Sequence, residues 1–217
     1  MLTLKDINKS HKQQLTNPFI GDEDGLLMTS YQSSAERIGQ KIYNELGPAN
    51  ILELCCGIGG ITAFLAKQHK HIWAVDFDKS KLGFAKTNLK NQNVDSKVTL
   101  LEGDIQDESF LKSFMKYNIN AVVTDVHWRS DLTADIYSTT SDLNSTIPPT
   151  PPLFKTIQTY ITENIVMHLG PHTNFQQLKD LGKCTIEKHV NSEGVVKSLT
   201  VYFGKLTSLN EVEVFKL

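Results

Sequence analysis

The residues with the clearest capacity for chemistry form a short glycine-rich turn. In Glu53-Leu54-Cys55-Cys56-Gly57-Ile58-Gly59-Gly60, the glycines follow an apolar run and precede a helical pattern. Glycines at such a place let a ligand approach the backbone closely and leave the first amides of the helix free to bind it. A pyrophosphate site would need a further glycine, but Ala63 and Phe64 lie beyond Gly60. The carboxylate of Glu53 favours a ligand that carries an amino group or a positive charge.

Acidic residues end four successive predicted strands: Glu53, Asp76, Asp104 and Asp125. The carboxyl ends of the strands are the ligand-binding edge of an open α/β sheet. Asp76 comes 17 residues after Gly59, where a carboxylate can accept hydrogen bonds from ribose hydroxyls. Any one of these acids could instead cap the helix that follows it. All four together with the glycine turn favour a nucleoside pocket.

The elements that must position these residues alternate along the chain. Apolar runs predict seven strands, at 51–54, 72–75, 98–101, 121–124, 164–169, 184–190 and 195–203. Helical periodicity predicts helices at 33–46, 61–68, 79–91, 107–116, 153–162 and 174–181, the first capped by Ser33 or Ser34. This alternation indicates an α/β fold with a mostly parallel sheet and an antiparallel hairpin at the end. The tail, 205–217, has only a weak pattern.

The segment 126–152 is the longest irregular stretch, rich in Ser, Thr and Asp. Loops of this length in a compact domain are usually functional or disordered, and we expect a lid or substrate loop.

Composition narrows the function classes. The 217 residues are 40% hydrophobic, enough for a core, and the 22 basic and 24 acidic residues leave a net charge of −2. We therefore do not expect an extended cationic coat for nucleic acid, although a small basic patch is compatible with this composition. The three cysteines, two of them adjacent, indicate reduced thiols, and no spacing of ligands predicts a metal. With no signal peptide and no apolar run of membrane-spanning length, we expect a cytoplasmic protein, or a nuclear one in a eukaryote, without a membrane partner.

The constellation resembles the class I S-adenosylmethionine-dependent methyltransferases. Among them the chain is similar to the trimethylguanosine synthase family, the RNA cap guanine-N2 methyltransferases, from about Gly25 to Gly204. The segments that carry the resemblance are Leu54-Cys55-Cys56-Gly57-Ile58-Gly59-Gly60, Ala74-Val75-Asp76-Phe77-Asp78, Glu102-Gly103-Asp104, Ile161-Thr162-Glu163-Asn164-Ile165-Val166 and Thr200-Val201-Tyr202-Phe203-Gly204. The resemblance implies a Rossmann-like seven-stranded sheet with helices on both faces and S-adenosyl-L-methionine as cofactor.

The resemblance also implies which residues would contact each part of the cofactor. Its methionine end would contact Glu53 and the turn residues Cys55, Cys56, Gly57, Gly59 and Gly60. The ribose would contact Asp76, the adenine would lie beside Phe77, and the adenine amine would lie beside Asp104 and Ile105. Asp125 would also border the cofactor. Residues 1–32 would form a segment that closes over the cofactor site, and 33–217 the methyltransferase domain.

The end of the fourth strand bears on the substrate. Methyltransferases of exocyclic base amines usually have Asp, Asn or Ser, then Pro-Pro, then an aromatic residue, whereas this chain has Asp125-Val126-His127-Trp128. Asp125 and the Val126 carbonyl could still accept hydrogen bonds from an amine and orient its lone pair. Trp128 could stack on a base, or pack beneath the long loop. His127 could accept a proton, and Arg129 could contact a phosphate or stay solvated.

The resemblance therefore implies methyl transfer to the N2 nitrogen of guanine, in RNA or in a cap-like nucleotide. Three alternatives stay open: methylation of another base or of a small molecule, a non-catalytic cofactor-binding subunit, and nicotinamide-dinucleotide binding. The missing Pro-Pro favours the second of these, and the missing third glycine disfavours the last.

Overall fold

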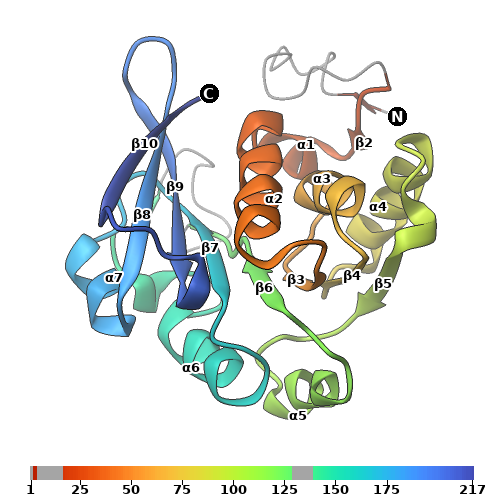
Figure 1. Ribbon diagram of the computed structural model, residues 1–217. Coiled ribbons are helices and arrows are strands. Elements are labelled where there is room, and N and C mark those ends of the chain that lie inside the picture. Colours follow the sequence, from red (N-terminus) through yellow and green to blue (C-terminus); the bar gives the residue numbers. More distant parts are fainter. Residues whose placement is uncertain (1, 4–16, 129–138) are drawn as a thin grey trace. The chain divides into compact units, whose positions relative to one another are not determined.

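The computed structural model describes residues 2–3, 17–128 and 139–217, which form two compact units, Met1–Asp104 and Ile105–Leu217 (Figure 1). Arg129, a candidate phosphate ligand, lies outside the described residues. Among the described residues, no helix is both long and apolar enough to cross a bilayer.

The first unit contains three parallel strands in the order β3-β4-β5. Their bounds are β3 Asn50–Leu54, β4 His71–Asp76 and β5 Val98–Glu102. The helices of this unit are α1 Glu23–Met28, α2 Gln32–Leu46, α3 Gly60–Gln68, α4 Lys79–Asn91 and the short 3-10 helix η1 Asp95–Lys97. Apolar residues of β3, β4 and α3 fill the core, and Leu54 pairs with Val75 beside the glycine turn.

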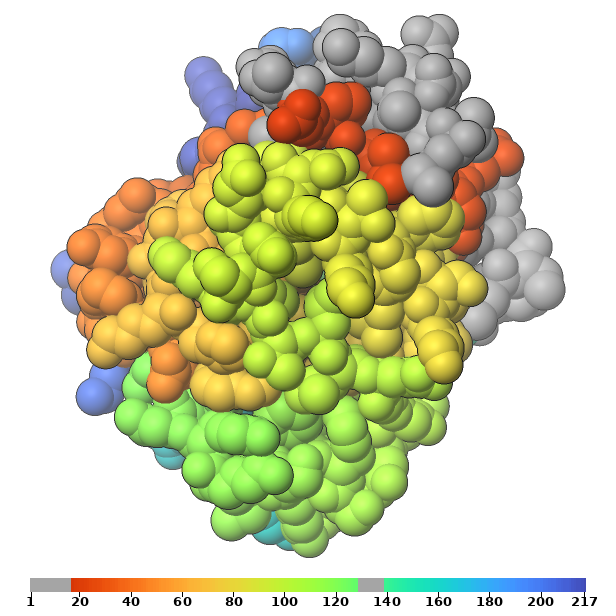
Figure 2. Space-filling model, turned by 90° about the vertical axis from the view of Figure 1, so that its right-hand side faces the viewer, coloured from red at the N-terminus to blue at the C-terminus, as the bar shows by residue number. Residues whose placement is uncertain are grey.

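Before α1, a two-stranded antiparallel sheet joins β1 Leu2–Thr3 to β2 Ile20–Gly21. The side chain of Asn88 on α4 holds β2 by accepting from the Ile20 amide and donating to the Ile20 carbonyl, both at 2.9 Å. It also donates to the carbonyl of Ile58 in the glycine turn at 2.9 Å. The red atoms of residues 17–28 accordingly lie against the yellow atoms of α4 in Figure 2. A buried Asn thus ties the N-terminal segment to the turn.

The described residues of the second unit form five strands in the order β10-β8-β9-β7-β6. Strands β6 and β7 are parallel, whereas β9 runs antiparallel to both β7 and β8. The strands are β6 Ala121–Thr124, β7 Ile165–Leu169, β8 Cys184–Val190, β9 Val196–Phe203 and β10 Val212–Lys216. The helices are α5 Glu108–Lys112, η2 Ser113–Lys116, η3 Leu143–Ser145, α6 Thr150–Tyr160, α7 Phe175–Leu181 and η4 Gly204–Leu206.

The α/β class, the mostly parallel sheet and the antiparallel hairpin β8–β9 are confirmed. Strand β10 was not expected: it pairs in parallel with β8 and adds a strand to the seven predicted from the sequence. The expected cap of α2 at Ser33 or Ser34 is wrong, because the helix begins at Gln32 and its N-cap is Tyr31, whose side chain makes no capping bond. Helix α6 begins at Thr150, three residues before the predicted start at residue 153, since proline is well tolerated in a first helical turn.

Candidate functional site

The glycine-rich turn between β3 and α3 has an unusual backbone. Three alternate residues have positive φ, namely Cys55 at 62°, Gly57 at 53° and Gly59 at 86°. This conformation is easily adopted by glycine and costs other residues energy, so Cys55 is held there by its surroundings. A side chain added at Gly57 would meet no protein atom within 4 Å, so the backbone there is open to a ligand.

Asp76, at the end of β4, fastens this turn. Its Oδ2 accepts the amide of Gly57 at 2.7 Å, and its Oδ1 accepts the amide of Asp78 at 2.9 Å. A carboxylate has about four acceptor positions, so the bonds to these two amides leave capacity for two ligand hydroxyls. The Gly103 amide donates to the Asp76 carbonyl at 3.1 Å, which brings Asp104 next to this strand end. The prediction that Asp76 and Asp104 share one edge is therefore correct within the first unit.

Glu53 and Cys56 line the inner side of the turn. Glu53 is only 1% exposed, and Cys56 is buried as well. Burial, reinforced by the carboxylates of Glu53 and Asp76, raises the pKa of the Cys56 thiol well above its ordinary value. Cys56 therefore stays protonated at neutral pH and is a small lining residue rather than a nucleophile.

Gly60 explains why the N-terminal segment can come so close to the turn. A Cβ at this position would lie 3.1 Å from Cγ2 of Thr29, which follows α1. Gly25 of α1 is similarly close to Ile58, whose Cγ2 would lie 2.7 Å from an added Cβ. These contacts place residues 20–29 directly against the glycine-rich turn, which the sequence alone indicated only through the resemblance.

The remaining predicted cofactor residues differ in exposure. Phe77, next to Asp76, is 63% exposed and offers a free aromatic face, and Asp104 is also exposed. Ile105 is buried and begins the second unit, as does the rest of the predicted site from Asp125 onward. The expectation that Asp125 shares an edge with the other three acids stays a prediction.

In the second unit, hydrogen bonds hold the turn that follows β6. His127 and Ile147 exchange two backbone bonds of 3.0 Å each, and the Thr140 amide donates to the Trp128 carbonyl at 2.7 Å. Val126 is buried, whereas Asp125, His127 and Trp128 are half-buried. The turn is thus clamped although it lacks the two prolines that would preset its backbone.

The indole of Trp128 has a defined setting. Its Nε1 donates to the carbonyl of His168 on β7 at 3.2 Å, and the two rings lie 5.5 Å apart at 59°. A Cβ at Gly170 would lie 3.3 Å from the Cβ of Trp128, so any larger residue there would require Trp128 to shift by a few tenths of an ångström. Trp128 therefore packs on β7 with one part and keeps another part exposed. The alternatives of packing and of stacking on a ligand are compatible.

The second half of the predicted irregular loop is an ordered segment, 139–149, which the sequence did not indicate. Asp142 accepts from the Asn144 amide at 3.0 Å, from Gln177 of α7 at 2.8 Å and from the Ser145 hydroxyl at 3.0 Å. These bonds lower its pKa from 3.8 to about 2. The sequence feature that could have indicated this segment is Asp142-Leu143-Asn144-Ser145, which is suited to an Asx turn.

Several solved structures with a similar fold are described as methyltransferases. A candidate methyltransferase from Porphyromonas gingivalis W83 is 17% identical with a TM-score of 0.65, over 88% of this chain and 44% of that one. An rRNA methylase from Streptococcus thermophilus is 14% identical with a TM-score of 0.54, over 77% of this chain and 93% of that one. A candidate methyltransferase from Streptococcus mutans, solved with SAH, is 14% identical with a TM-score of 0.50, over 78% of this chain and 97% of that one. This chain thus spans less than half of the Porphyromonas protein, and these identities establish the methyltransferase fold alone.

The sequence model of the family described as RNA cap guanine-N2 methyltransferase matches residues 49–206. The match runs from the residue before β3 to the end of η4. It includes both the glycine-rich turn and Asp125–Trp128. It covers well over half of the chain, and the cofactor of such enzymes is S-adenosyl-L-methionine. The protein is therefore an S-adenosylmethionine-dependent methyltransferase that belongs to the RNA cap guanine-N2 methyltransferase family.

Proposed function

We propose that this protein transfers a methyl group to the exocyclic N2 nitrogen of a guanine, in RNA or in a cap-like nucleotide. The family membership supports the reaction and the class of acceptor. The observation that carries the proposal is the clamped turn Asp125–Trp128, in which hydrogen bonds from Thr140 and Ile147 take the place of the two missing prolines.

The residues of the first unit fit S-adenosylmethionine, whose positively charged sulfur makes its methyl group electrophilic. Glu53 would attract the positive methionine end, and the open backbone at Gly57 would let it approach. The free amides at the start of α3 suit its carboxylate. The set that would hold the methionine end is Glu53, Cys55, Cys56, Gly57, Gly59 and Gly60.

The nucleoside end would lie at the ends of β4 and β5. The unused acceptor capacity of Asp76 suits the two ribose hydroxyls, and the exposed ring of Phe77 suits an adenine face. Asp104 and Ile105 would border the adenine amine, and Asp125 would contribute where cofactor and substrate adjoin. Residues 1–32 would close over the bound cofactor, a role supported by the contacts of Gly25 and Thr29 with the turn.

The substrate amine needs orientation more than activation, because its lone pair must point at the methyl carbon. We assign this task to the Asp125 carboxylate and the Val126 carbonyl as acceptors of its N–H bonds. The exposed part of Trp128 would stack on the guanine, and attraction to the ring would be stronger for a cationic 7-methylguanine. His127 would accept the proton that the amine releases, and Arg129 would contact a phosphate.

RNA is favoured over a free small molecule by one face of α4. Lys79, Lys86 and Lys90 are exposed, and their spacing of seven and four residues puts them on one side of the helix. The helix contains no acidic residue. Replacing all three by Gln should reduce the slope of log affinity against log salt for single-stranded RNA by about 2, since each contact contributes about 0.7.

Transfer of labelled methyl groups tests the proposal. The acceptors are 7-methylguanosine-capped RNA, ribosomal RNA, bulk tRNA and free guanine nucleotides. Trp128→Ala should lower kcat/KM for the accepted substrate about 10- to 100-fold through lost stacking, with S-adenosylmethionine affinity unchanged. Asp125→Ala should have at least as large an effect. Trp73→Phe, at the other tryptophan of the chain, is the matched control and should leave transfer unchanged.

Two results would overturn the proposal. If the protein binds S-adenosylmethionine but labels none of these acceptors, a non-catalytic cofactor-binding role replaces the proposed one. If label appears only on another base or on a small molecule, the enzyme class stands and the guanine specificity falls.

A further inference from the structure

A line of buried polar side chains crosses the second unit, where apolar residues would be expected. Thr200 on the central strand β9 pairs directly with Glu187 of β8 on one side and with His168 of β7 on the other. His189 of β8 and Tyr202 of β9 lie on the same face, since each is two residues from a member of the line. We call these five residues the polar row; each is at most 1% exposed.

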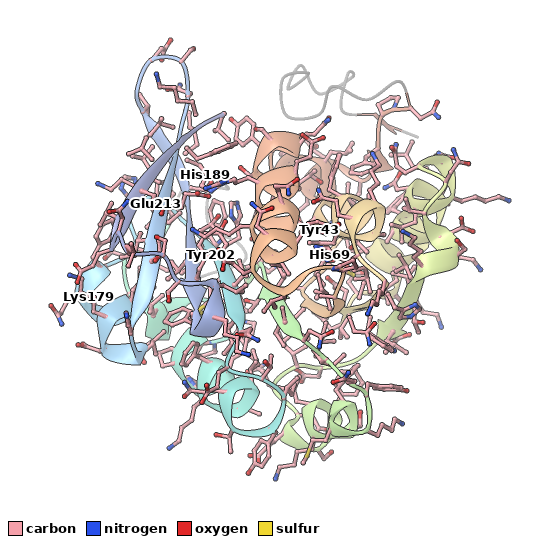
Figure 3. The ribbon with its side chains drawn as sticks, in the orientation of Figure 1. Tyr43, His69, Lys179, His189, Tyr202 and Glu213 are labelled. Carbon is pink, nitrogen blue, oxygen red and sulfur yellow. The ribbon has the colours of Figure 1, made fainter. Side chains whose placement is uncertain are left out.

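Short contacts link the polar row from end to end. The Tyr202 hydroxyl donates to Oε1 of Glu187 at 3.2 Å, and Nε2 of His189 lies 3.2 Å from the same oxygen. Oγ1 of Thr200 lies 2.9 Å from Nε2 of His189 and 3.0 Å from Nδ1 of His168. Figure 3 shows His189 and Tyr202 on the two neighbouring strands of the hairpin.

The direction of these bonds follows from the acid. A carboxylate accepts hydrogen bonds, so in its Nε2–H tautomer His189 donates toward Glu187 and Thr200. The Thr200 hydroxyl then donates to Nδ1 of His168, which fixes the imidazole in one tautomer and one orientation. Thr200 therefore joins the His168 ring to the acid end of the polar row by hydrogen bonds, beside the T-shaped contact in which the His168 and His189 rings lie 5.7 Å apart.

His168 is the end of the polar row that lies against residues 125–128, which we call the substrate turn. Its carbonyl accepts the indole N–H of Trp128 and its ring lies 5.5 Å from the indole, as described above. Gly170, the residue that follows β7, lies against the indole, where an added Cβ would come within 3.3 Å of the Cβ of Trp128. The orientation of Trp128 thus depends on a ring that Thr200 holds from behind.

The opposite face of the same strands shows what ordinary packing would look like. There Ile186 faces Val201, both are buried, and Phe203 packs on Phe154 of α6 at 4.6 Å between ring centroids. A buried polar network is less favourable than such packing unless its members satisfy one another. Because the members of the polar row do satisfy one another, the network can hold its side chains in fixed orientations, which supports a positional role.

We propose that the polar row is a positioning device for Trp128: it holds the His168 ring, and through it the plane of the indole, in the orientation that receives the substrate base. The proposal deepens the proposed function, because it rests on Trp128 as the stacking surface. His168 and Thr200 are positioning residues and touch neither the cofactor nor the base.

Thr200→Val is the sharpest test, since it keeps the shape and removes the linking hydroxyl. It should lower kcat/KM for the accepted RNA about 10- to 100-fold, with S-adenosylmethionine affinity unchanged. Thr200→Ser, which restores the hydroxyl, should recover most of the rate. Thr185→Val is the matched control: Thr185 is equally buried on the same face of β8, but its hydroxyl bonds to Ser208 and Asn210 outside the polar row.

A second readout is independent of methyl transfer. With Trp73→Phe in the background, Trp128 is the sole tryptophan, so fluorescence anisotropy and acrylamide quenching report on its indole alone. Thr200→Val should make the indole more mobile and more easily quenched, whereas Thr185→Val should not. If Thr200→Val does not fold, Tyr202→Phe, which removes only the hydroxyl on Glu187, should shift the fluorescence in the same direction by less.

Equal quenching and equal kinetics in Thr200→Val and Thr185→Val would overturn the positioning role. If the unaltered protein methylates no RNA, the proposed function fails, and the fluorescence comparison still decides whether the polar row holds Trp128.

Discussion

The two turns that we assign to cofactor and substrate are held in place by different means. The cofactor turn, 55–60, is shaped by its own backbone, with positive φ at Cys55, Gly57 and Gly59 and one carboxylate behind it. The substrate turn, 125–128, has no such feature and is held by partners elsewhere in the sequence, Thr140, Ile147 and His168. The cofactor is the same throughout the enzyme class, whereas the substrate varies. A turn held by exchangeable partners can change its shape without rebuilding the strand that carries it.

The largest effect is expected from a substitution that strains the backbone of the cofactor turn. In Gly59→Val, a β-branched residue would have to adopt φ 86°, with its Cβ 3.4 Å from that of Ala85. Strain of this kind costs about 1–3 kcal/mol, and relaxing the turn should lower S-adenosylmethionine affinity about 10- to 100-fold. Isothermal titration with S-adenosylmethionine measures this loss, and thermal unfolding followed by circular dichroism shows whether the fold is kept.

The matched control is Gly83→Ala in the middle of α4. A Cβ there meets nothing within 4 Å and the backbone is helical, so the change should raise stability by about 0.5–1 kcal/mol and leave cofactor binding unchanged. If Gly59→Val binds the cofactor as tightly as Gly83→Ala does, the turn is not held by its backbone and the comparison fails.

A smaller effect should come from Asp142, which orders the segment that clamps Trp128. Its pKa is lowered to about 2 by bonds from Asn144, Gln177 and Ser145, so the folded state favours the ionised form. The stabilisation is therefore fully present above about pH 4 and is lost as the pH falls through about 2. Asp142→Ala should unfold at a lower temperature than the unaltered protein at pH 7. The difference should shrink as the pH falls below about 4 and disappear only below about pH 2.

Activity separates this effect from a general loss of stability. Asp107→Ala removes a comparable carboxylate, which caps α5 by accepting from the amides of Ser109 and Phe110. Asp142→Ala should slow methyl transfer severalfold while Asp107→Ala does not, because only Asp142 orders the segment next to Trp128. Equal losses of activity in the two variants would show that the clamp of the substrate turn is unimportant for the reaction.

The same difference between the turns explains what the sequence could predict. The cofactor turn and Asp76 are visible in the sequence because their chemistry is local: glycines between a strand and a helix, and an acid that ends the next strand. The clamp of Trp128 is not, since Thr140 and His168 are not marked by their type or spacing. The polar row could not be predicted for a related reason. Glu187 and His189, two residues apart in a strand, are typical of a solvent-exposed face, and only the structure shows that this face is buried. Strand β10 is short and an edge strand, with Val212 and Val214 exposed, so burial left no pattern in it.

The smallest expected effect concerns Cys56, the thiol beside the cofactor turn. Its pKa is raised well above the ordinary value by burial and by the nearby carboxylates of Glu53 and Asp76. The attacking species in alkylation is the thiolate, so iodoacetamide at pH 8 should leave Cys56 unmodified in the folded protein and modify it fully in urea. Peptide mass spectrometry distinguishes Cys56 from its neighbour Cys55. Rapid alkylation of Cys56 at neutral pH would instead show that the turn opens readily, and the contrast with the substrate turn would then be lost.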